Sequence, residues 1–152
     1  MVNVFDTGCA YDPDDPDGYR SGQAHVGRAA GGTANTVKLF ETPPGQSICP
    51  YHYEYEEEWL LVLAGDPTLR GPDGERQLHT GELVCFPVGP AGAHKVTNRG
   101  DTTTRVLMWS SAREPAVAVY PDSNKIGVWP GNEADTLLLR RADGARGYYD
   151  GE

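Results

Sequence analysis

The chain has 152 residues, a formal net charge of −9 and three cysteines. This length suits one domain with a single buried core, and the acidic balance argues against nucleic acid or an anionic membrane surface as a partner. No apolar run approaches the roughly 20 residues that span a bilayer. The first residues lack the basic and apolar regions of a signal peptide, and three scattered cysteines suit free thiols, so we expect a cytoplasmic protein.

The first 24 residues are predicted to form an N-terminal arm or loop. Residues 10–24 are acidic and rich in Pro and Gly, a composition that disfavours a helix and favours a surface segment. A strand is expected over residues 33–41, where β-branched and apolar residues alternate with polar ones.

Residues 45–65 carry the strongest chemical signal. A turn at residues 43–45 leads into a short strand with His52 and Glu54, then an acidic bend, then an apolar strand that opens with Glu58 and stops at Gly65. Because strand side chains alternate faces, His52 and Glu54 point the same way. If the bend folds the chain back, Glu58 joins them, and an imidazole and two carboxylates then converge on one point, as a divalent-metal site requires.

The rest of the chain reads as short strands separated by turns. A hairpin over residues 68–78 has its tip at 71–74, a further strand reaches a Pro/Gly corner at 87–89, and another begins at His94. Strands are also expected at 103–110, 117–120 and 126–129, while residues 135–143 suit either a short helix or an edge strand. This pattern predicts an all-β barrel or jelly roll over residues 25–130, with a C-terminal tail over 131–152 that packs on the barrel.

Two ordered motifs in this region resemble those of the cupins. The first is matched by Gly45, His52, Glu58 and Gly65, and the second by Gly81, Pro87, Gly89, His94 and Asn98. The resemblance implies a single small cupin, a double-stranded β-helix or jelly-roll barrel, with His52, Glu58 and His94 as metal ligands. It also implies a homodimer, for which the N-terminal arm could wrap a second subunit. Glu54 departs from the pattern, since the family has a second His there, and the gap from Gly89 to His94 is longer than usual.

The donor set bears on the identity of the metal. Two imidazole nitrogens (His52, His94) and two carboxylates (Glu54, Glu58) favour harder ions, so Fe or Mn is expected, with Zn, Ni or Co as alternatives. If Glu54 stays off the metal, the other three form a two-His, one-carboxylate face, and Glu54 is free to act as a catalytic general base.

Strand parity places further residues. Four apolar side chains are expected to line a substrate pocket beside the metal: Leu60, Val62, Phe86 and Val96. Trp59, Leu61 and Leu63 should face the opposite way. Glu56, Glu57, His25 and His79 are expected at the surface, the tyrosines at 51, 53 and 55 in the core or at the rim, Cys49 and Cys85 as small buried groups, and Asn98 as a brace for a strand or corner.

These features favour a metal-dependent enzyme acting on a small organic molecule. An oxygenase or dioxygenase is the first hypothesis, with isomerase, lyase or hydrolase chemistry as an alternative. A non-catalytic binding or sensing module, and a metal-free sugar-modifying cupin that uses His and carboxylate as acid and base, also remain open because fold does not fix function.

Overall fold

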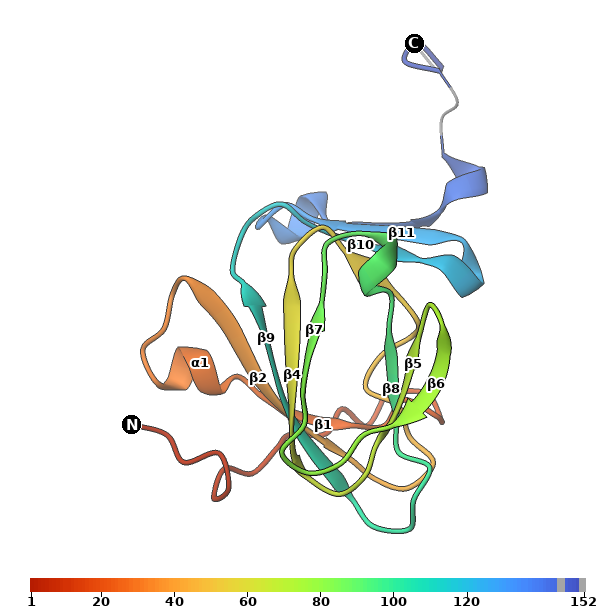
Figure 1. The fold of residues 1–152 in the computed structure, drawn as a ribbon. Coiled ribbons are helices and arrows are strands. Elements are labelled where there is room, and N and C mark those ends of the chain that lie inside the picture. Colours follow the sequence, from red (N-terminus) through yellow and green to blue (C-terminus); the bar gives the residue numbers. More distant parts are fainter. Residues whose placement is uncertain (145–146, 151–152) are drawn as a thin grey trace.

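A computed structural model of the protein describes residues 1–144 and 147–150, and it consists mainly of β-strands (Figure 1). The strands are β1 (Gly22–Ala24), β2 (Asn35–Thr42), β3 (Tyr53–Glu54), β4 (Glu58–Ala64), β5 (Thr68–Gly71), β6 (Gly74–Gln77), β7 (Leu83–Phe86), β8 (Lys95–Thr97), β9 (Thr104–Ser111), β10 (Ala116–Tyr120), β11 (Lys125–Trp129) and β12 (Leu137–Arg140). The helices are α1 (Val26–Ala29) and the short 3₁₀ turns η1 (Pro90–Gly92), η2 (Pro121–Ser123), η3 (Glu133–Asp135) and η4 (Arg141–Asp143). The all-β prediction is confirmed.

The strands form three antiparallel sheets. One has five strands in the order β1-β2-β9-β4-β7, a second has the order β6-β5-β8, and a third has the order β12-β11-β10-β3. In Figure 1 the first two sheets face each other as the walls of a barrel, and β10 and β11 lie across one end. This arrangement is the jelly roll that the sequence predicts.

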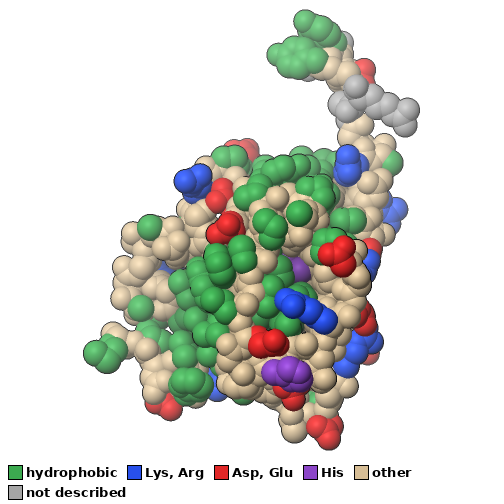
Figure 2. Space-filling view, viewed as in Figure 1, with side chains coloured by type: hydrophobic (Ala, Val, Ile, Leu, Met, Phe, Trp, Pro, Cys, Tyr) green, Lys and Arg blue, Asp and Glu red, His purple; other side chains and the backbone are tan. Residues whose placement is uncertain are grey.

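Alternation along β4 sets the inside and the outside of the barrel. Leu60 and Val62 are fully buried and join the main apolar cluster between the sheets, while the alternate residues Trp59, Leu61 and Leu63 are only half-buried. On the outer side Trp59 stacks on Trp109 of β9, with ring centroids 6.2 Å apart. The predicted parity of β4 is therefore confirmed as far as Val62, after which a bulge interrupts the pairing with β9. Figure 2 shows hydrophobic side chains gathered over the outer side of β4 and β7.

Glycines permit two close approaches of the chain. Gly65 ends β4 with a φ of 76°, and a Cβ there would lie 2.9 Å from the Thr104 side chain. A Cβ on Gly92 would lie 1.9 Å from the Pro87 carbonyl oxygen, so only glycine fits inside this corner. The corner directly precedes His94, and its tight packing fixes the position of this residue just before β8 begins.

The two ends of the chain are more regular than the sequence indicates. Gly22–Ala24 at the end of the expected arm is a strand that pairs with β2, and Ala10 forms a bridge to Gln23. The arm interpretation is therefore wrong for this stretch. Small residues gave no strand signal there, but the packing of Tyr11 requires a glycine at position 22, because a Cβ on Gly22 would lie 2.7 Å from the Tyr11 ring. The Arg105 guanidinium also donates hydrogen bonds to the carbonyls of Val4, Phe5 and Thr7.

In the C-terminal tail the edge-strand alternative is confirmed, because β12 pairs with β11 over residues 137–140. Residues 145–146 and 151–152 of the expected tail lie outside the described residues. The proposed boundaries of arm, barrel and tail stay predictions. Among the described residues, no helix has the length and apolar character needed to cross a membrane.

Candidate metal centre

The two motif histidines are joined directly by the backbone. His52 and His94 form an antiparallel bridge in which each backbone N–H donates to the other's carbonyl, at 3.1 and 2.7 Å. In such a pair the side chains project from the same side of the ladder. The two imidazole rings accordingly lie 4.7 Å apart, centroid to centroid. Two histidines that are 42 residues apart in sequence therefore present their nitrogens side by side.

Backbone carbonyls fix the tautomer of both rings. Nδ1 of His52 lies 3.0 Å from the Pro50 carbonyl, and Nδ1 of His94 lies 2.9 Å from the Gly92 carbonyl. A carbonyl can only accept, so each Nδ1 carries the hydrogen and each Nε2 keeps a free lone pair. Burial lowers the pKa of both imidazoles, that of His94 to about 3, which keeps the lone pairs available at neutral pH.

Glu58 brings a carboxylate to these lone pairs. Its Oε2 lies 3.6 Å from Nε2 of His94 and 3.8 Å from Nε2 of His52. Burial, and secondarily the neighbouring Glu54, raises the pKa of Glu58 to about 8. Uncompensated, this carboxylate is costly in its site, and a cation would relieve the cost.

The three residues fit a divalent metal ion. Their ligand atoms all lie within 4.8 Å of one another. Atoms each about 2.1 Å from one ion are expected to be about 3 to 3.5 Å apart, so small adjustments close the site. Nε2 of His94 is also fully buried and is one of two such side-chain polar atoms that lack a hydrogen-bond partner within the described chain. Buried polar atoms are normally paired, and a bound metal ion would give this nitrogen its partner.

Glu54 stands slightly apart from this cluster. Its Oε1 lies 3.7 Å from Nε2 of His52, but it is not among the three residues whose ligand atoms are mutually close. Burial is the main cause that raises its pKa, and Lys38 opposes the rise. Both roles given to Glu54 by the sequence, fourth ligand and general base, stay predictions.

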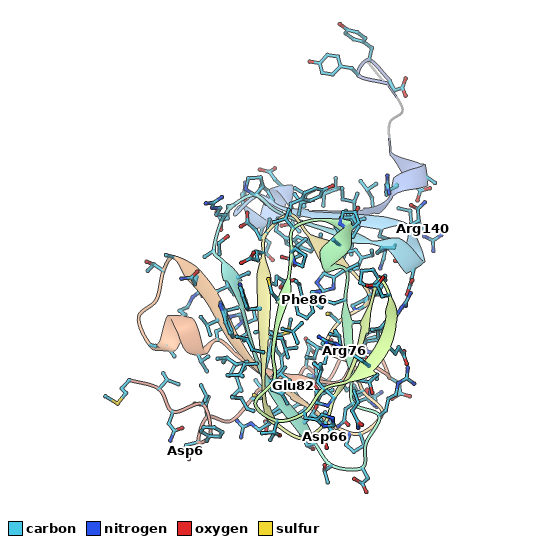
Figure 3. All side chains as sticks on the ribbon, viewed as in Figure 1. Asp6, Asp66, Arg76, Glu82, Phe86 and Arg140 are labelled. Atoms are coloured by element: carbon cyan, nitrogen blue, oxygen red, sulfur yellow. The ribbon has the colours of Figure 1, made fainter. Side chains whose placement is uncertain are left out.

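The four expected pocket residues lie in the core. Leu60, Val62, Phe86 and Val96 belong to the buried apolar cluster, and the cavity at the metal centre is lined by other residues. Phe86 nevertheless contacts the site, because its ring stacks on His94 with centroids 3.7 Å apart (Phe86 is labelled in Figure 3). Phe86 therefore packs against a metal ligand from the core side, whereas the space for a substrate is lined by other residues.

That space is a cavity of about 710 Å³ at the end of the barrel. His52, Glu54 and Glu58 form part of one side, while other walls come from β2, the segment after β9, and the third sheet. Its remaining lining is chemically mixed and includes Arg28, Thr36, Lys38, Phe40, Ile48, Cys49, Glu56, Met108, Ser110, Ser111, Arg113, Tyr120 and Trp129.

In the acidic bend, one of the two glutamates expected at the surface is placed differently in the structure. Glu57 is exposed, as expected, and accepts a hydrogen bond from Trp59 Nε1 at 2.8 Å. Glu56 was expected at the surface as well, but it is half-buried, lines the cavity and accepts a hydrogen bond from Ser111 Oγ. That interpretation is wrong for Glu56, because β9 extends to Ser111 and gives the carboxylate a partner.

The remaining side chains are placed largely as expected. His25 and His79 are exposed, and Nδ1 of His79 lies 2.9 Å from Asp66. Asn98 is fully buried and donates to the carbonyls of Thr42 and Thr102 at 2.7 and 2.8 Å, which confirms its bracing role.

The cysteines and tyrosines can also be compared with the burial expected from the sequence. All three cysteines are free thiols, and burial raises the pKa of Cys49 to about 12, so it remains a neutral thiol. Cys85, expected to be buried, is exposed because it points to the outer face of β7. Tyr51, Tyr53 and Tyr55 lie at the rim, half-buried or exposed.

Sequence reasoning missed two kinds of cavity residue. Tyr120 packs on His52 with ring centroids 5.8 Å apart, and burial raises its pKa to about 12. Arg28 and Lys38 both face the cavity, although the sequence left their facing undetermined. The alternation Thr36, Lys38, Phe40 was visible, but only the pairing of β2 with β9 decides which side faces inward.

Comparisons with known proteins agree with this architecture. Residues 38–110, from β2 to β9, match the sequence model of the cupin domain. The structure superimposes on that of an Acidithiobacillus ferrooxidans protein with the provisional name sugar phosphate isomerase, at 28% identity and a TM-score of 0.76 over 84% of this chain and 81% of that one. It also superimposes on a sugar phosphate isomerase of the cupin superfamily from Silicibacter pomeroyi, at 20% identity and a TM-score of 0.81 over 97% of both chains.

Two polyketide-pathway proteins are also similar. The polyketide cyclase RemF of Streptomyces resistomycificus shares 22% identity and a TM-score of 0.63, over 76% of this chain and 82% of its own. The tetracenomycin polyketide synthase protein TcmJ of Streptomyces glaucescens is 24% identical over 87 residues, so the match spans only 57% of that relative. Residues 38–110 thus form a cupin domain, and the chain has the fold of a small single-barrel cupin.

Proposed function

We propose that this cupin is a divalent-metal-dependent enzyme that moves a proton on a small organic molecule, as an isomerase or a related non-redox catalyst does. The observation that carries the proposal is the buried, unpartnered Nε2 of His94, which faces the carboxylate of Glu58 and the free Nε2 of His52. Fe or Mn is the favoured ion, with Zn, Ni or Co as alternatives.

When bound, the metal supplies Lewis acidity toward a substrate carbonyl or hydroxyl oxygen. His52, Glu58 and His94 hold it, and the carbonyls that accept from the two Nδ1 atoms keep both rings oriented. Glu54 lies on the same side of the cavity, 3.7 Å from His52, at a position from which its carboxylate can accept a proton from a substrate and return it.

The walls of the cavity are partly apolar. Phe40, Ile48, Met108 and Tyr120 contribute apolar surface next to the polar residues. The provisional name of the Acidithiobacillus ferrooxidans relative, and the cyclase name of RemF, agree with chemistry that needs no oxidant.

A second candidate is an oxygenase, the first hypothesis from the sequence. It is favoured by one observation, namely that the mutually close ligand atoms come from two His and one carboxylate, the set used by non-haem Fe(II) oxygenases. The homodimer expected from the sequence stays a prediction.

Incorporation of deuterium from the solvent into a substrate distinguishes the isomerase from the oxygenase. Metal-loaded protein is incubated in D₂O with a panel of small aldoses, ketoses and hydroxy ketones and their phosphates, while NMR records C–H exchange and an electrode records O₂. We expect deuterium incorporation, lost about 100-fold or more in Glu54→Gln with the metal content unchanged. Oxygen consumption without deuterium incorporation would identify the oxygenase instead, and purified protein that holds no divalent metal would overturn both.

A further inference from the structure

The cavity at the metal centre has a second, cationic side. Its lining includes Arg28 from the end of α1, Lys38 from β2 and Arg113 from the segment that follows β9. The same cavity is lined by five carboxylates, so the cations form one part of a mixed lining: Glu54, Glu56, Glu58, Glu114 and Glu133. We propose that this cationic wall binds an oxyanion group, a phosphate or a carboxylate, of the substrate, and this inference rests on the proposed function.

The strand register places Lys38 on the inner face. Lys38 pairs with Met108 of β9, which pairs with Leu60 of β4. Met108 and Leu60 are both buried in the core, so the side chain of Lys38 projects from the same face of the sheet as theirs. A lysine on an inward face normally needs a carboxylate partner or a ligand, because leaving its charge unpaired is costly.

The side chain of Lys38 has neither an ion pair nor a hydrogen bond to any described residue, and the same holds for the side chains of Arg28 and Arg113. Several cations outside the cavity are paired: Arg70 makes two hydrogen bonds to Asp122, Arg99 one to Glu75, and Lys95 one to Tyr19. Three free donors therefore line this one cavity, and a bound oxyanion would satisfy them with charge-assisted hydrogen bonds.

The distance from the metal ligands suits a substrate group remote from the reacting atoms. Lys38, Met108 and Leu60 are paired across the three strands. Two residues further along each strand, on the same face, Thr36, Ser110 and Glu58 are paired in the same way. β2 and β4 flank β9, so their backbones are about 10 Å apart. An oxyanion held by Lys38 and Arg28 thus leaves room for a few carbon atoms between itself and Glu58.

Neutralisation of the acidic site is the competing explanation for Lys38. Its charge does act on the pKa of Glu54 and Glu58, which it lowers. However, three half-buried carboxylates (Glu54, Glu56 and Glu58) are already balanced by a divalent ion and Lys38 together. Arg28 and Arg113 are exposed, as are the other two lining carboxylates, Glu114 and Glu133. Neither arginine forms an ion pair with a described carboxylate, so both remain available.

Calorimetric titration with inorganic phosphate, and separately with acetate, tests the proposal on metal-free and metal-loaded protein. We expect phosphate or acetate to bind both forms, and to bind Lys38→Met and Arg28→Gln about tenfold more weakly, as the loss of one charge-assisted hydrogen bond predicts. Lys38→Arg should retain most of the affinity. Arg76→Gln is the matched control, because this exposed residue of β6 has the same charge and does not line the cavity (Figure 3).

The outcomes separate the two proposals. Stronger binding of phosphate than of acetate identifies a phosphate ester as the substrate class, and the reverse identifies a carboxylate. Anion binding only to metal-loaded protein, unchanged in the variants, would place the anion on the metal and overturn the cationic wall. If elemental analysis instead finds no metal, the proposed function fails, while the titrations of metal-free protein still decide the anion site. Should Lys38→Met not fold by circular dichroism, Arg28→Gln and Lys38→Arg decide it.

Discussion

The inner face of the five-stranded sheet carries two contrasting regions on the same strands. On β4, Leu60 and Val62 are fully buried in the apolar core, whereas Glu58 faces the metal site. On β9 the same change occurs between Met108, which is buried, and Ser110, which lines the cavity. On each strand the packed core and the metal site are therefore only two residues apart. The rigid core holds the polar side chains in position although their burial is energetically unfavourable.

Phe86 belongs to both regions. Its side chain is buried in the apolar cluster, and its ring stacks on His94 at 3.7 Å. Five predictions test whether the packed region determines stability and the polar region determines metal binding.

The largest effect is expected from Leu60→Ala in the packed region. The side chain is fully buried, so its truncation should lower the free energy of unfolding by about 2–5 kcal/mol, measured by urea denaturation. Leu83→Ala is the matched control, because Leu83 points outward from β7 and is 55% exposed, and its loss should cost less than about 1 kcal/mol. Equal costs for the two variants would contradict the assigned inside and outside of the barrel.

His94→Ala tests the polar region. Removing one of three ligands should weaken metal binding by about 100-fold or more, beyond the loss typical of residues that only orient a ligand. Elemental analysis and metal titration measure this effect. His79→Ala, which removes an exposed imidazole paired with Asp66, should retain the metal. A His94→Ala protein with full metal content would show that the ligands are wrongly assigned.

Metal affinity should rise with pH. The pKa of Glu58 in the metal-free protein is raised to about 8, so below that pH a proton competes with the metal. Affinity should therefore increase up to about tenfold per pH unit between pH 6.5 and 8 and then level off. A flat profile of metal titrations over this window would contradict the buried environment assigned to Glu58.

The same shift has a consequence for stability. A carboxyl whose pKa is raised on folding stabilises the fold while protonated, so its contribution is present at low pH and is lost as pH rises through about 8. In the unfolded chain the histidines release their protons near pH 6.5, which opposes this trend there, and only above about pH 7.5 are the two buried histidines neutral in both states. Metal-free protein should thus become less stable from about pH 7.5 to 8.5 in urea denaturation, and Glu58→Gln should show less of this decline.

The smallest effect is expected outside both regions. Arg70 donates two hydrogen bonds to Asp122, at 2.6 and 3.0 Å, but both side chains are at least 40% exposed. Asp122→Asn should lower the unfolding free energy by about 1 kcal/mol or less and leave metal binding unchanged. A loss of metal in this variant would mean that the site depends on surface contacts as well as on the packed sheet.

The sequence predicted those features that depend on local pattern. Alternation along residues 58–62 located the inner face of β4, and the spacing of His52, Glu58 and His94 located the metal cluster. What it could not provide depends on pairing between distant strands. The facing of Lys38 requires the register of β2 with β9, and the half-buried position of Glu56 requires Ser111 beside it.

The pocket prediction shows the same limit. Parity correctly placed Leu60 and Val62 on the face of Glu58, but parity does not say at which point along a strand the packed core ends and a cavity begins. That boundary is set by which segments cover the end of the barrel, and here those are β10, β11 and the turns around them.

The backbone bridge between His52 and His94 also bears on how the molecule could be modified. Because the two ligand-bearing segments are fastened directly to each other, the intervening chain does not determine their spacing. The β5–β6 turn at residues 71–74 carries no residue of the cavity lining, and lengthening a loop costs little entropy. This turn is therefore a tolerant position for a spectroscopic label or an inserted peptide.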